Sequence, residues 1–361
     1  MTKCSWIDTS LVIDSQGFLK PCCNMGGSAV FDKTRSTKDI HIDDIDSIND
    51  SYFYNDFLSY LRGSLKQNKI IGTSECLNCQ FQIEKNVISH WDRGEQITKN
   101  FIPDGTVKYL EITSSNICNQ TCITCSPYFS SKWETIEHLF ENAGGQGHVK
   151  YGKKFNLTDD GLKKIFEILP TLEVLLLKGG EPFSDLRNLK ILEELAIVNP
   201  TCEVWFTTNG SIISNKFLNA LSKLYKVGIT ASLDHIGKKY EWIRSTPFEQ
   251  TLHTMERIYD HTGHKCKVGP TISYFNILDL KEIEDFYTEF EYTKWTNTDF
   301  YSLNFVHWPE EMDFHNTRTQ EELDTLNLGL VSKFNQEMFD TLQKKIKIMN
   351  GIRGFNWSDD L

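Results

Sequence analysis

The 361-residue chain lacks a long hydrophobic run. None of its apolar stretches approaches the roughly 18 residues that cross a bilayer, and its amino terminus lacks the pattern of a secretory signal peptide. Internal repeats and low-complexity tracts are missing as well. We therefore expect a soluble, cytoplasmic protein with no membrane partner.

The chain also lacks an excess of positive charge, because 38 Lys and Arg residues face 49 Asp and Glu residues, for a net charge of -11. Broad contact with DNA or RNA needs many Lys and Arg residues against the phosphates. General nucleic-acid binding is therefore not expected. The balance still permits a nucleotide-sized substrate or a local basic patch.

Cysteine, in contrast, is plentiful, with ten residues. Cytosolic reductants keep structural disulfides rare, so ten cysteines without an export signal indicate metal ligands and buried thiols. Cys118, Cys122 and Cys125 directly follow a strand-like run at 108–113. Three thiolates on one tight loop can hold three irons of a cubane 4Fe-4S cluster and leave the fourth iron open. A three-cysteine zinc site is the alternative.

After residue 105 the sequence alternates between strand-like and helical patterns. The expected strands are 107–113, 172–178, 203–208, 227–233, 266–274 and 300–306, and the expected helices include 185–198, 214–224, 240–259 and 278–290. Such alternation indicates parallel βαβ units, and the length suffices for one large α/β barrel plus a small accessory domain. A composition break at 101–105 predicts the boundary between them.

Polar and glycine-rich motifs follow the ends of the expected strands. In chain order they are the cysteine loop, Gly179-Gly180-Glu181-Pro182, Thr207-Thr208-Asn209-Gly210, Ser232-Leu233-Asp234-His235, Asn276 and His307-Trp308-Pro309. In α/β barrels the chemistry gathers at the carboxyl ends of the strands. The placement of these motifs therefore favours a partial barrel over a doubly wound sheet.

The spacing CxxxCxxC at Cys118, Cys122 and Cys125 resembles the radical SAM superfamily. The resemblance implies an α/β fold built on a partial (β/α)6 TIM-like barrel. It also implies two cofactors, a 4Fe-4S cluster and S-adenosylmethionine (SAM), whose amino and carboxylate groups chelate the open iron. Reductive cleavage of SAM in this family yields a 5'-deoxyadenosyl radical.

Gly179, Gly180 and Glu181 resemble the GGEP element of the family, which contacts the amino group of SAM. Glycines let backbone approach a ligand closely, and a carboxylate is an acceptor suited to an ammonium group. An ordinary strand-to-helix turn is the alternative. Asn209 is similar to another family element, which lies near the ribose and the methionine part of SAM.

Ser232 and Asp234 alternate on the expected fourth strand, so both side chains are predicted to face the barrel mouth and bind ribose hydroxyls. Arg244 lies in the next helix, where its guanidinium can pair with the SAM carboxylate. This layout resembles the cofactor contacts of peptide-modifying radical SAM enzymes. A turn-capping aspartate and a surface arginine are the alternative.

One position departs from the family, because Thr124 stands where an aromatic residue often packs near adenine. Tyr128 or Phe129 can cover the base instead. His307 is a candidate for substrate binding or proton transfer, with a structural role as the alternative. No catalytic side chain is assigned.

The amino-terminal region carries a second set of cysteines. A predicted hairpin with Gly17 in its turn separates Cys4 from Cys22, and Cys76 and Cys79 form a distant CxxC. Four such thiolates can hold one metal centre, either an iron-sulfur cluster or the zinc of a zinc ribbon. The pattern resembles the SPASM and twitch domains that bind an auxiliary 4Fe-4S cluster, although here it precedes the barrel.

Cys22 and Cys23 compete for one ligand position in this set. We choose Cys22 because the spacing Gly17-x4-Cys22 matches the family, which leaves Cys23 as a spare thiol, a replacement ligand or a buried structural residue. The resemblance to radical SAM proteins with an amino-terminal twitch-like domain covers nearly the whole chain. It predicts an auxiliary-cluster domain at 1–100, the barrel at 101–309 and a capping segment at 310–361.

The resemblance implies an enzyme that abstracts hydrogen from an unactivated C–H bond of its substrate. A peptide or protein is the favoured substrate, because many SPASM and twitch enzymes modify peptides. Oxidation or rearrangement of a small molecule or nucleoside is the alternative. A noncatalytic metal-binding interaction protein is the alternative from a different class. The expected electron donor is flavodoxin-like or ferredoxin-like.

Overall fold

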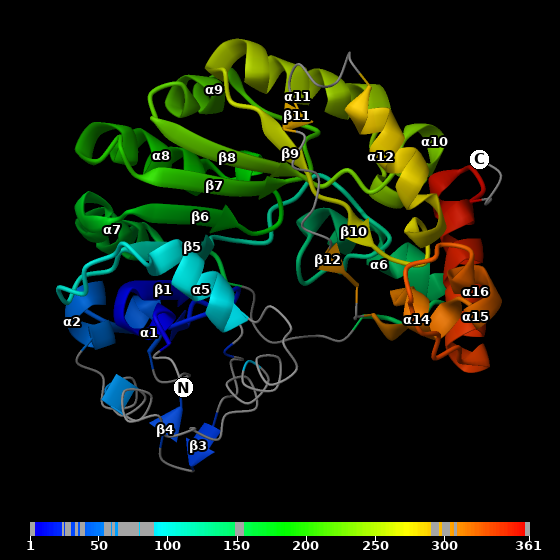
Figure 1. Cartoon of the computed structure of the whole chain (residues 1–361), viewed down its shortest axis with the longest axis horizontal. Helices are drawn as coiled ribbons and strands as arrows, with labels where there is room; N and C mark the ends of the chain where they lie inside the picture. The colour runs from blue at the N-terminus through cyan, green and yellow to red at the C-terminus, as the bar shows by residue number, and fades with distance from the viewer. Residues whose placement is uncertain are drawn as a thin grey trace.

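The computed structural model describes residues 4–23, 25, 30–32, 35–36, 40–53, 59, 62–63, 79, 90–148, 155–289, 296–297, 304–306 and 309–357. Within these ranges no helix is long and apolar enough to cross a membrane. Figure 1 shows a large sheet with helices packed around it and a smaller helical group that contains the last helix, α16.

The described strands include an eight-stranded sheet in the order β11-β9-β8-β7-β6-β5-β1-β2. Its members are β1 (Ser10–Ile13), β2 (Leu19–Lys20), β5 (Tyr109–Thr113), β6 (Val174–Lys178), β7 (Glu203–Thr208), β8 (Lys226–Ala231), β9 (Cys266–Val268) and β11 (Thr296–Asn297). Neighbouring strands run parallel except in the β1–β2 hairpin. Among the described strands, the two edges β2 and β11 do not pair, so the sheet is open. The expected α/β partial barrel is confirmed.

The strands of the sheet have two different faces, because successive side chains of a strand point in opposite directions. On β6, Leu175 and Leu177 are buried, whereas Leu176 and Lys178 line a cavity on the concave side. The apolar face packs against helices in one large core. These helices are α7 (Asp159–Ile168), α8 (Leu186–Val198), α9 (Asn215–Leu221), α11 (Phe248–Thr262) and α12 (Leu280–Thr288).

The expected helix 240–259 is wrong as a single element. The structure divides it into α10 (Gly237–Arg244) and α11. Ser245 adopts a left-handed conformation with a φ of 56°, which ends α10. Pro247 follows two residues later, and a proline disfavours the helical conformation of the residue before it. The break therefore has a local cause in the sequence.

The expected strand 266–274 is also two elements. β9 ends at Val268, and β10 (Thr271–Ile272) pairs with β12 (Asn304–Phe305) in a separate two-stranded sheet. Pro270 lies between β9 and β10, and its missing N–H removes one bond of the ladder. Short 3-10 helices make further connections, at η3 (Leu169–Thr171), η4 (Pro182–Ser184) and η5 (Ile277–Asp279).

Backbone pairing joins the amino-terminal segment to the sheet. The expected hairpin is confirmed, since β1 and β2 are antiparallel and Gly17 in their turn has a φ of 88°. β1 also pairs in parallel with β5, which places Ser10 opposite Tyr109. The sheet therefore continues across the expected boundary near residue 101. Other described elements here are α1 (Trp6–Thr9), β3 (Val30–Asp32), β4 (Arg35–Ser36), η2 (Ile42–Asp44), α2 (Ile48–Phe53) and α5 (His90–Thr98).

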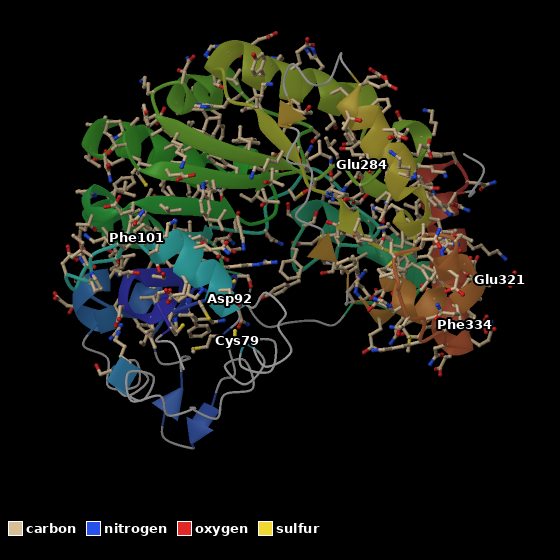
Figure 2. All side chains as sticks on the ribbon, viewed as in Figure 1. Cys79, Asp92, Phe101, Glu284, Glu321 and Phe334 are labelled. Atoms are coloured by element: carbon tan, nitrogen blue, oxygen red, sulfur yellow. The ribbon has the colours of Figure 1, made fainter. Side chains whose placement is uncertain are left out.

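The carboxyl-terminal segment forms a second core with α6 (Ser131–Asn142) and the end of α10. Its elements are η6 (Glu310–Met312), α14 (Phe314–Thr317), α15 (Gln320–Asp324) and α16 (Gln336–Arg353). Figure 2 shows Glu321 and Phe334 on the side of this group that points away from the sheet. Ile123 of the cysteine loop is buried in the same core. The carboxyl-terminal segment therefore packs against the cysteine loop.

Candidate functional site

The cysteine loop follows β5 and borders a cavity of about 1100 Å³ on the concave side of the sheet. Cys118, Cys122 and Cys125 all line this cavity. Cys122 is buried, and the other two residues are half-buried. The structure therefore brings the three predicted cluster cysteines to one cavity.

Side chains from three separate segments hold the backbone of the cysteine loop. Trp133 of α6 donates its indole N–H to the Cys122 carbonyl oxygen at 2.8 Å. The Ser245 hydroxyl, at the end of α10, accepts from the Thr121 N–H at 2.8 Å. Arg353 of α16 donates from Nη2 to the Thr121 carbonyl oxygen at 2.6 Å. These bonds satisfy polar groups that the irregular loop does not pair within a helix or strand.

Arg353 brings a positive charge to the cysteine loop. Its guanidinium lies over the Trp242 ring, 5.0 Å from the ring centroid. Its Nε and Nη1 atoms are buried and have no hydrogen-bond partner among the described residues. Burial lowers the pKa of Arg353 to about 10, while the nearby Cys122 acts in the opposite direction. Arg353 therefore remains a cation at neutral pH.

Gly179 and Gly180 let the end of β6 approach the cysteine loop closely. The Gly180 N–H donates to the Ser115 carbonyl oxygen at 3.1 Å, and the Glu181 N–H donates to the Ile117 carbonyl oxygen at 2.7 Å. A Cβ atom on Gly180 would lie 2.4 Å from the Ile117 oxygen. Gly179 has a φ of 138°, and its Cβ would lie 2.7 Å from the Ser115 oxygen. Both glycines line the cavity, and the backbone of the loop leaves no room for a side chain at either.

The Glu181 carboxylate is buried and accepts three hydrogen bonds from its own chain. Its Oε2 accepts from the Asn209 N–H at 2.7 Å. Its Oε1 accepts from the Thr208 hydroxyl at 2.7 Å and from the Phe183 N–H at 3.0 Å. Burial raises the pKa of Glu181 to about 7, against the lowering effect of these bonds. The expected contact with an ammonium group stays a prediction, and the observed contacts position Asn209.

Asn209 lines the cavity beside Cys118. Its Nδ2 donates to Asn119 Oδ1 at 2.9 Å and lies 3.9 Å from the Cys118 sulfur. Its Oδ1 accepts from the Ser211 N–H at 2.9 Å and from the Ser211 hydroxyl at 2.7 Å. Hydrogen bonds on both sides therefore fix the orientation of this amide next to the cysteine loop.

Asp234 and Arg244 form a buried ion pair. Arg244 Nε lies 2.6 Å from Asp234 Oδ2, and Arg244 Nη2 donates to Asp234 Oδ1 at 2.7 Å. The remaining nitrogen, Nη1, lies 3.7 Å from the Cys122 sulfur, and Arg244 lines the cavity. Asp234 thus occupies one edge of the guanidinium and directs the other edge toward the cysteine loop.

Ser232 and Asp234 do not share a strand face, so this expectation is wrong. β8 ends at Ala231, and the Leu233 N–H donates back to the Ala231 carbonyl oxygen at 3.0 Å. This turn breaks the alternation that a continued strand would have. Ser232 lines the cavity, whereas Asp234 is buried against its ion-pair partner.

The cysteine loop supplies a donor set that fits an iron-sulfur cluster. Burial raises the pKa of Cys118 to about 11 and that of Cys125 to about 12, and it also raises the pKa of Cys122. Metal binding at these sulfurs must therefore displace protons. Within the described ranges, no three His, Cys, Asp or Glu side chains are grouped to hold a single metal ion. A cubane needs no such grouping, because each cysteine binds its own iron.

The amino-terminal cysteines are described only in part. Cys4 and Cys22 pack against the same apolar cluster at the start of β5. Cys79 is half-buried and lies on the side of the amino-terminal elements in Figure 2. Cys76 lies outside the described residues. Cys23 lines the large cavity, so the neighbouring cysteines Cys22 and Cys23 have different surroundings.

Sequence reasoning missed two features of this site. Arg353 is 232 residues from its partner Thr121, a distance at which no local pattern gives a signal. The concave residue Thr207 had a signal, because Glu203 and Thr207 share a face of β7 that alternates with the apolar Val204 and Phe206. Lys178 had none, because it follows an unbroken apolar run in β6. His307, the remaining candidate among the motifs that follow the expected strands, lies outside the described residues.

A family model described as the radical SAM superfamily matches residues 112–288. No curated protein matches the chain. Among solved structures, the chain is similar to native anSMEcpe with bound AdoMet and Kp18Cys peptide, at 13% identity, 69% coverage of this chain, 62% of that chain and a TM-score of 0.41. It is also similar to Streptococcus suis SuiB bound to S-adenosylmethionine, at 16% identity, 80% and 74% coverage and a TM-score of 0.35.

The chain spans 50% of the length of the histidine-tagged anSMEcpe that was solved with AdoMet. The family match begins within β5, continues through the cysteine loop and the rim motifs, and ends with α12. It therefore includes the end of β5, all of β6 to β10 and the three cysteines that line the cavity. Residues 112–288 of the chain therefore form a domain of the radical SAM superfamily.

Proposed function

We propose that the protein cleaves SAM reductively at a 4Fe-4S cluster held by Cys118, Cys122 and Cys125, and that the resulting 5'-deoxyadenosyl radical abstracts hydrogen from a substrate. The observation that carries this proposal is the gathering of the three thiols at one large cavity. Superfamily membership supports the same chemistry. Cluster and SAM together supply the electron transfer and the radical when they are bound.

The chain's own residues would bind and orient these groups. Asn209, Ser232 and the backbone of Gly179 and Gly180 line the cavity and offer amide, hydroxyl and peptide groups to SAM. Arg244 retains one nitrogen on the side of the cysteine loop, where it can meet a carboxylate or a cluster sulfur. We assign Glu181 and Asp234 to the same site as positioning residues, since their observed contacts hold Asn209 and Arg244.

Arg353 and Arg244 give the cluster site a positive surrounding. A cubane bound by three thiolates carries net negative charge, and charge near a cluster is one determinant of its reduction potential. The Arg244 guanidinium lies 3.7 Å from the Cys122 sulfur, and Arg353 is half-buried and donates to the Thr121 carbonyl oxygen. Both cations favour the thiolate form of Cys122.

We also propose that Cys4, Cys22, Cys76 and Cys79 hold an auxiliary 4Fe-4S cluster, with a zinc ribbon as the alternative. The packing of Cys4 and Cys22 against one apolar cluster supports this. The favoured substrate is a peptide, with a small molecule or nucleoside as the alternative, and the electron donor is flavodoxin-like or ferredoxin-like. Alanine in place of the four cysteines is expected to remove about four irons per chain. Unchanged iron content would refute the assignment.

The test of the main proposal is mass-spectrometric detection of 5'-deoxyadenosine. The protein is reconstituted anaerobically with iron and sulfide and then given SAM and dithionite. Wild type is expected to form 5'-deoxyadenosine, and the triple variant Cys118→Ala/Cys122→Ala/Cys125→Ala is expected to form none. Cys202→Ala is the matched control, because Cys202 is a buried core thiol away from the cavity. Equal product from the triple variant and wild type would contradict the proposal.

A noncatalytic metal-binding protein would behave differently in this assay. It would bind metal at the cysteines, and neither wild type nor the triple variant would form 5'-deoxyadenosine. A colourless, zinc-loaded protein after strictly anaerobic purification would favour this alternative, because zinc has no redox chemistry.

A further inference from the structure

Four polar side chains form one row across the concave face of the sheet. Lys178, Thr207, Thr230 and Lys267 belong to β6, β7, β8 and β9 and all line the cavity. The register pairs Thr207 with Thr230 and Thr230 with Lys267. Leu177 pairs with Phe206, so the next residues, Lys178 and Thr207, are also neighbours. We call these four side chains the Lys-Thr-Thr-Lys row.

The row offers hydrogen-bond donors to the cavity. Lys178 Nζ donates to Glu111 Oε1 at 2.8 Å, which holds this end of the row in place. The hydroxyls of Thr207 and Thr230 and the ammonium of Lys267 make no hydrogen bond or ion pair within the described part of the chain. Neighbouring strands lie about 4.8 Å apart, so one ligand group can touch two or three of these side chains together.

The described residues that line the cavity include more basic than acidic side chains, although the whole chain carries a net charge of -11. Six Lys and Arg side chains and two Glu side chains are among the described residues that line it. The basic ones are Arg93, Lys178, Lys226, Arg244, Lys265 and Lys267, and the acidic ones are Glu111 and Glu203. A concave wall with an excess of one charge sign raises the local concentration of ligands of the opposite sign.

The row lies close to the proposed SAM contacts. Lys178, Thr207 and Thr230 each precede a rim residue by two positions, namely Gly180, Asn209 and Ser232. Two residues span at most about 7 Å of extended chain, and both the row and these rim residues line the same cavity. A group bound to the row therefore sits directly beneath the rim and within reach of its cofactor site.

We propose that the Lys-Thr-Thr-Lys row binds a carboxylate of the substrate, and that the substrate is an acidic peptide. This inference rests on the proposed function and names its substrate class. Lysine and threonine side chains donate to a carboxylate, and no acidic side chain interrupts the row. Leu176 and Trp205 also line the cavity, two residues before Lys178 and Thr207 on the same strands. They offer apolar surface to the rest of a peptide.

A phosphate group is disfavoured by the same geometry. Lysine can bind phosphate as a point charge, but phosphate sites typically also contain an arginine fork, a helix N-terminus or a glycine-rich backbone nest. None of these is among the members of the row, because all four donors are lysine or threonine side chains of the strands β6 to β9. A carboxylate needs fewer donors and matches two neighbouring hydroxyls with a lysine on either side.

The test is isothermal titration calorimetry of the reconstituted, SAM-bound protein with a short blocked peptide of alternating Glu and Leu. The matched probe is the same peptide with Gln in place of Glu. The Glu peptide is expected to bind at least tenfold more tightly than the Gln peptide. Lys267→Gln is expected to weaken binding of the Glu peptide about tenfold, since it removes a charge-assisted hydrogen bond. Thr207→Val/Thr230→Val is expected to weaken it severalfold, and inorganic phosphate is expected to compete poorly.

Lys216→Gln is the control variant, because Lys216 is an exposed lysine on the outer helix α9. It is expected to bind the Glu peptide as wild type does. Equal affinities of wild type and Lys267→Gln, or of the Glu and Gln peptides, would overturn the inference. Tighter binding of phosphate than of the peptide would overturn it as well, and so would a loss of SAM affinity in Lys267→Gln with unchanged peptide affinity.

The same samples separate this inference from the proposed function. Formation of 5'-deoxyadenosine is measured beside peptide binding. Lys267-dependent peptide binding without 5'-deoxyadenosine supports the row and counts against the radical chemistry. Normal 5'-deoxyadenosine with no peptide binding supports the chemistry and overturns the row.

Discussion

At the scale of single residues, the glycine pair after β6 has a role that is visible from backbone distances. A Cβ on Gly180 would lie 2.4 Å from the Ile117 carbonyl oxygen and 2.7 Å from the Asn116 oxygen. Both are backbone atoms, so a side chain can be admitted only if the cysteine loop moves. The backbone of the glycine pair therefore packs directly against the backbone of the cysteine loop.

Gly180→Ala is expected to destabilise the protein by about 1–3 kcal/mol, the usual range for overpacking in a tight site. It is also expected to lower the iron bound by the Cys118 loop after reconstitution. Urea denaturation and iron analysis measure the two effects. Gly351→Ala is the control, because Gly351 lies in α16 with no atom within 4 Å of an added Cβ. There alanine is expected to stabilise the helix by up to about 1 kcal/mol, and an equal loss in both variants would contradict the clash.

Glu181 is a buried carboxyl group whose pKa is raised to about 7 by burial, from an ordinary value of 4.5. Between pH 4.5 and about pH 7, Glu181 keeps its proton in the folded protein and has released it in the unfolded chain. Its contribution to stability is therefore fully present below about pH 4.5 and is lost as the pH rises through about 7. The full change corresponds to about 3 kcal/mol.

Glu181→Gln removes this proton equilibrium. The free energy of unfolding of wild type, relative to the variant, is expected to fall by about 3 kcal/mol from pH 4 to pH 8. Urea titrations of apo-protein across this range give the measurement. Glu193→Gln, on the exposed side of α8, serves as the control and is expected to keep the wild-type pH profile. A relative stability of Glu181→Gln that does not vary with pH would contradict the prediction.

What could be predicted at this scale depended on whether the signal was local. The cysteine spacing and the glycine pair were local patterns, and the structure places them together at the cavity. The contact of the glycines with the backbone of the cysteine loop was not predictable. The sequence does not show whether a glycine makes room for a ligand or for a neighbouring backbone. The ion pair between Arg244 and Asp234 was not predicted either. The sequence indicated a contact of each residue with SAM, because spacing does not show that the two side chains meet each other.

At the scale of elements, three helices meet the cysteine loop from different directions. α6 contributes Trp133, the end of α10 contributes Ser245, and α16 contributes Arg353. Ser245 can accept from the loop because its left-handed conformation ends α10 at this point. The helix break that the periodicity missed is therefore part of how the loop is held.

Arg353→Gln is expected to weaken the contact between α16 and the cysteine loop. The substitution removes a partly buried charge-assisted hydrogen bond to the Thr121 carbonyl oxygen, at an expected cost of about 1–3 kcal/mol. The loss of a nearby cation is also expected to lower the reduction potential of the bound cluster. Denaturation of apo-protein and an EPR-monitored redox titration measure the two effects.

Lys347→Gln is the matched control for this prediction, because Lys347 is an exposed cation on the same helix. It is expected to leave both the stability and the potential close to wild type. If Arg353→Gln also behaved as wild type, α16 would be a packed helix with no influence on the loop.

Element boundaries were predictable where the apolar pattern was long and regular. β7 spans 203–208, as its alternation predicted, whereas the expected helix 240–259 ignored the proline at 247. The position of α16 was not predictable, because its contacts with α6 and the loop are between segments far apart in the chain. Periodicity identifies a buried helix face but not the surface that covers it.

At the scale of the whole molecule, the amino-terminal segment and the barrel share one sheet and one core. β1 pairs in parallel with β5, and Leu11 and Ile13 are buried in the same core as residues of β5 to β9. Sequence composition predicted a boundary near 101, since it reports a change of residue types and carries no information on strand pairing. The segment that bears Cys4 and Cys22 is thus tied to the sheet that bears the Cys118 loop.

This shared core makes a prediction about unfolding. Leu11→Ala deletes a fully buried side chain in β1 and is expected to lower the free energy of unfolding by about 2–5 kcal/mol. If β1 is integral to the barrel, the loss lowers the stability of the entire sheet, and circular dichroism and tryptophan fluorescence shift together in urea. Leu186→Ala, at a position that is 65% exposed, is the control and is expected to change little. An early transition of the amino-terminal segment, followed by a barrel of unchanged stability, would instead mean that the two parts unfold separately despite their common sheet.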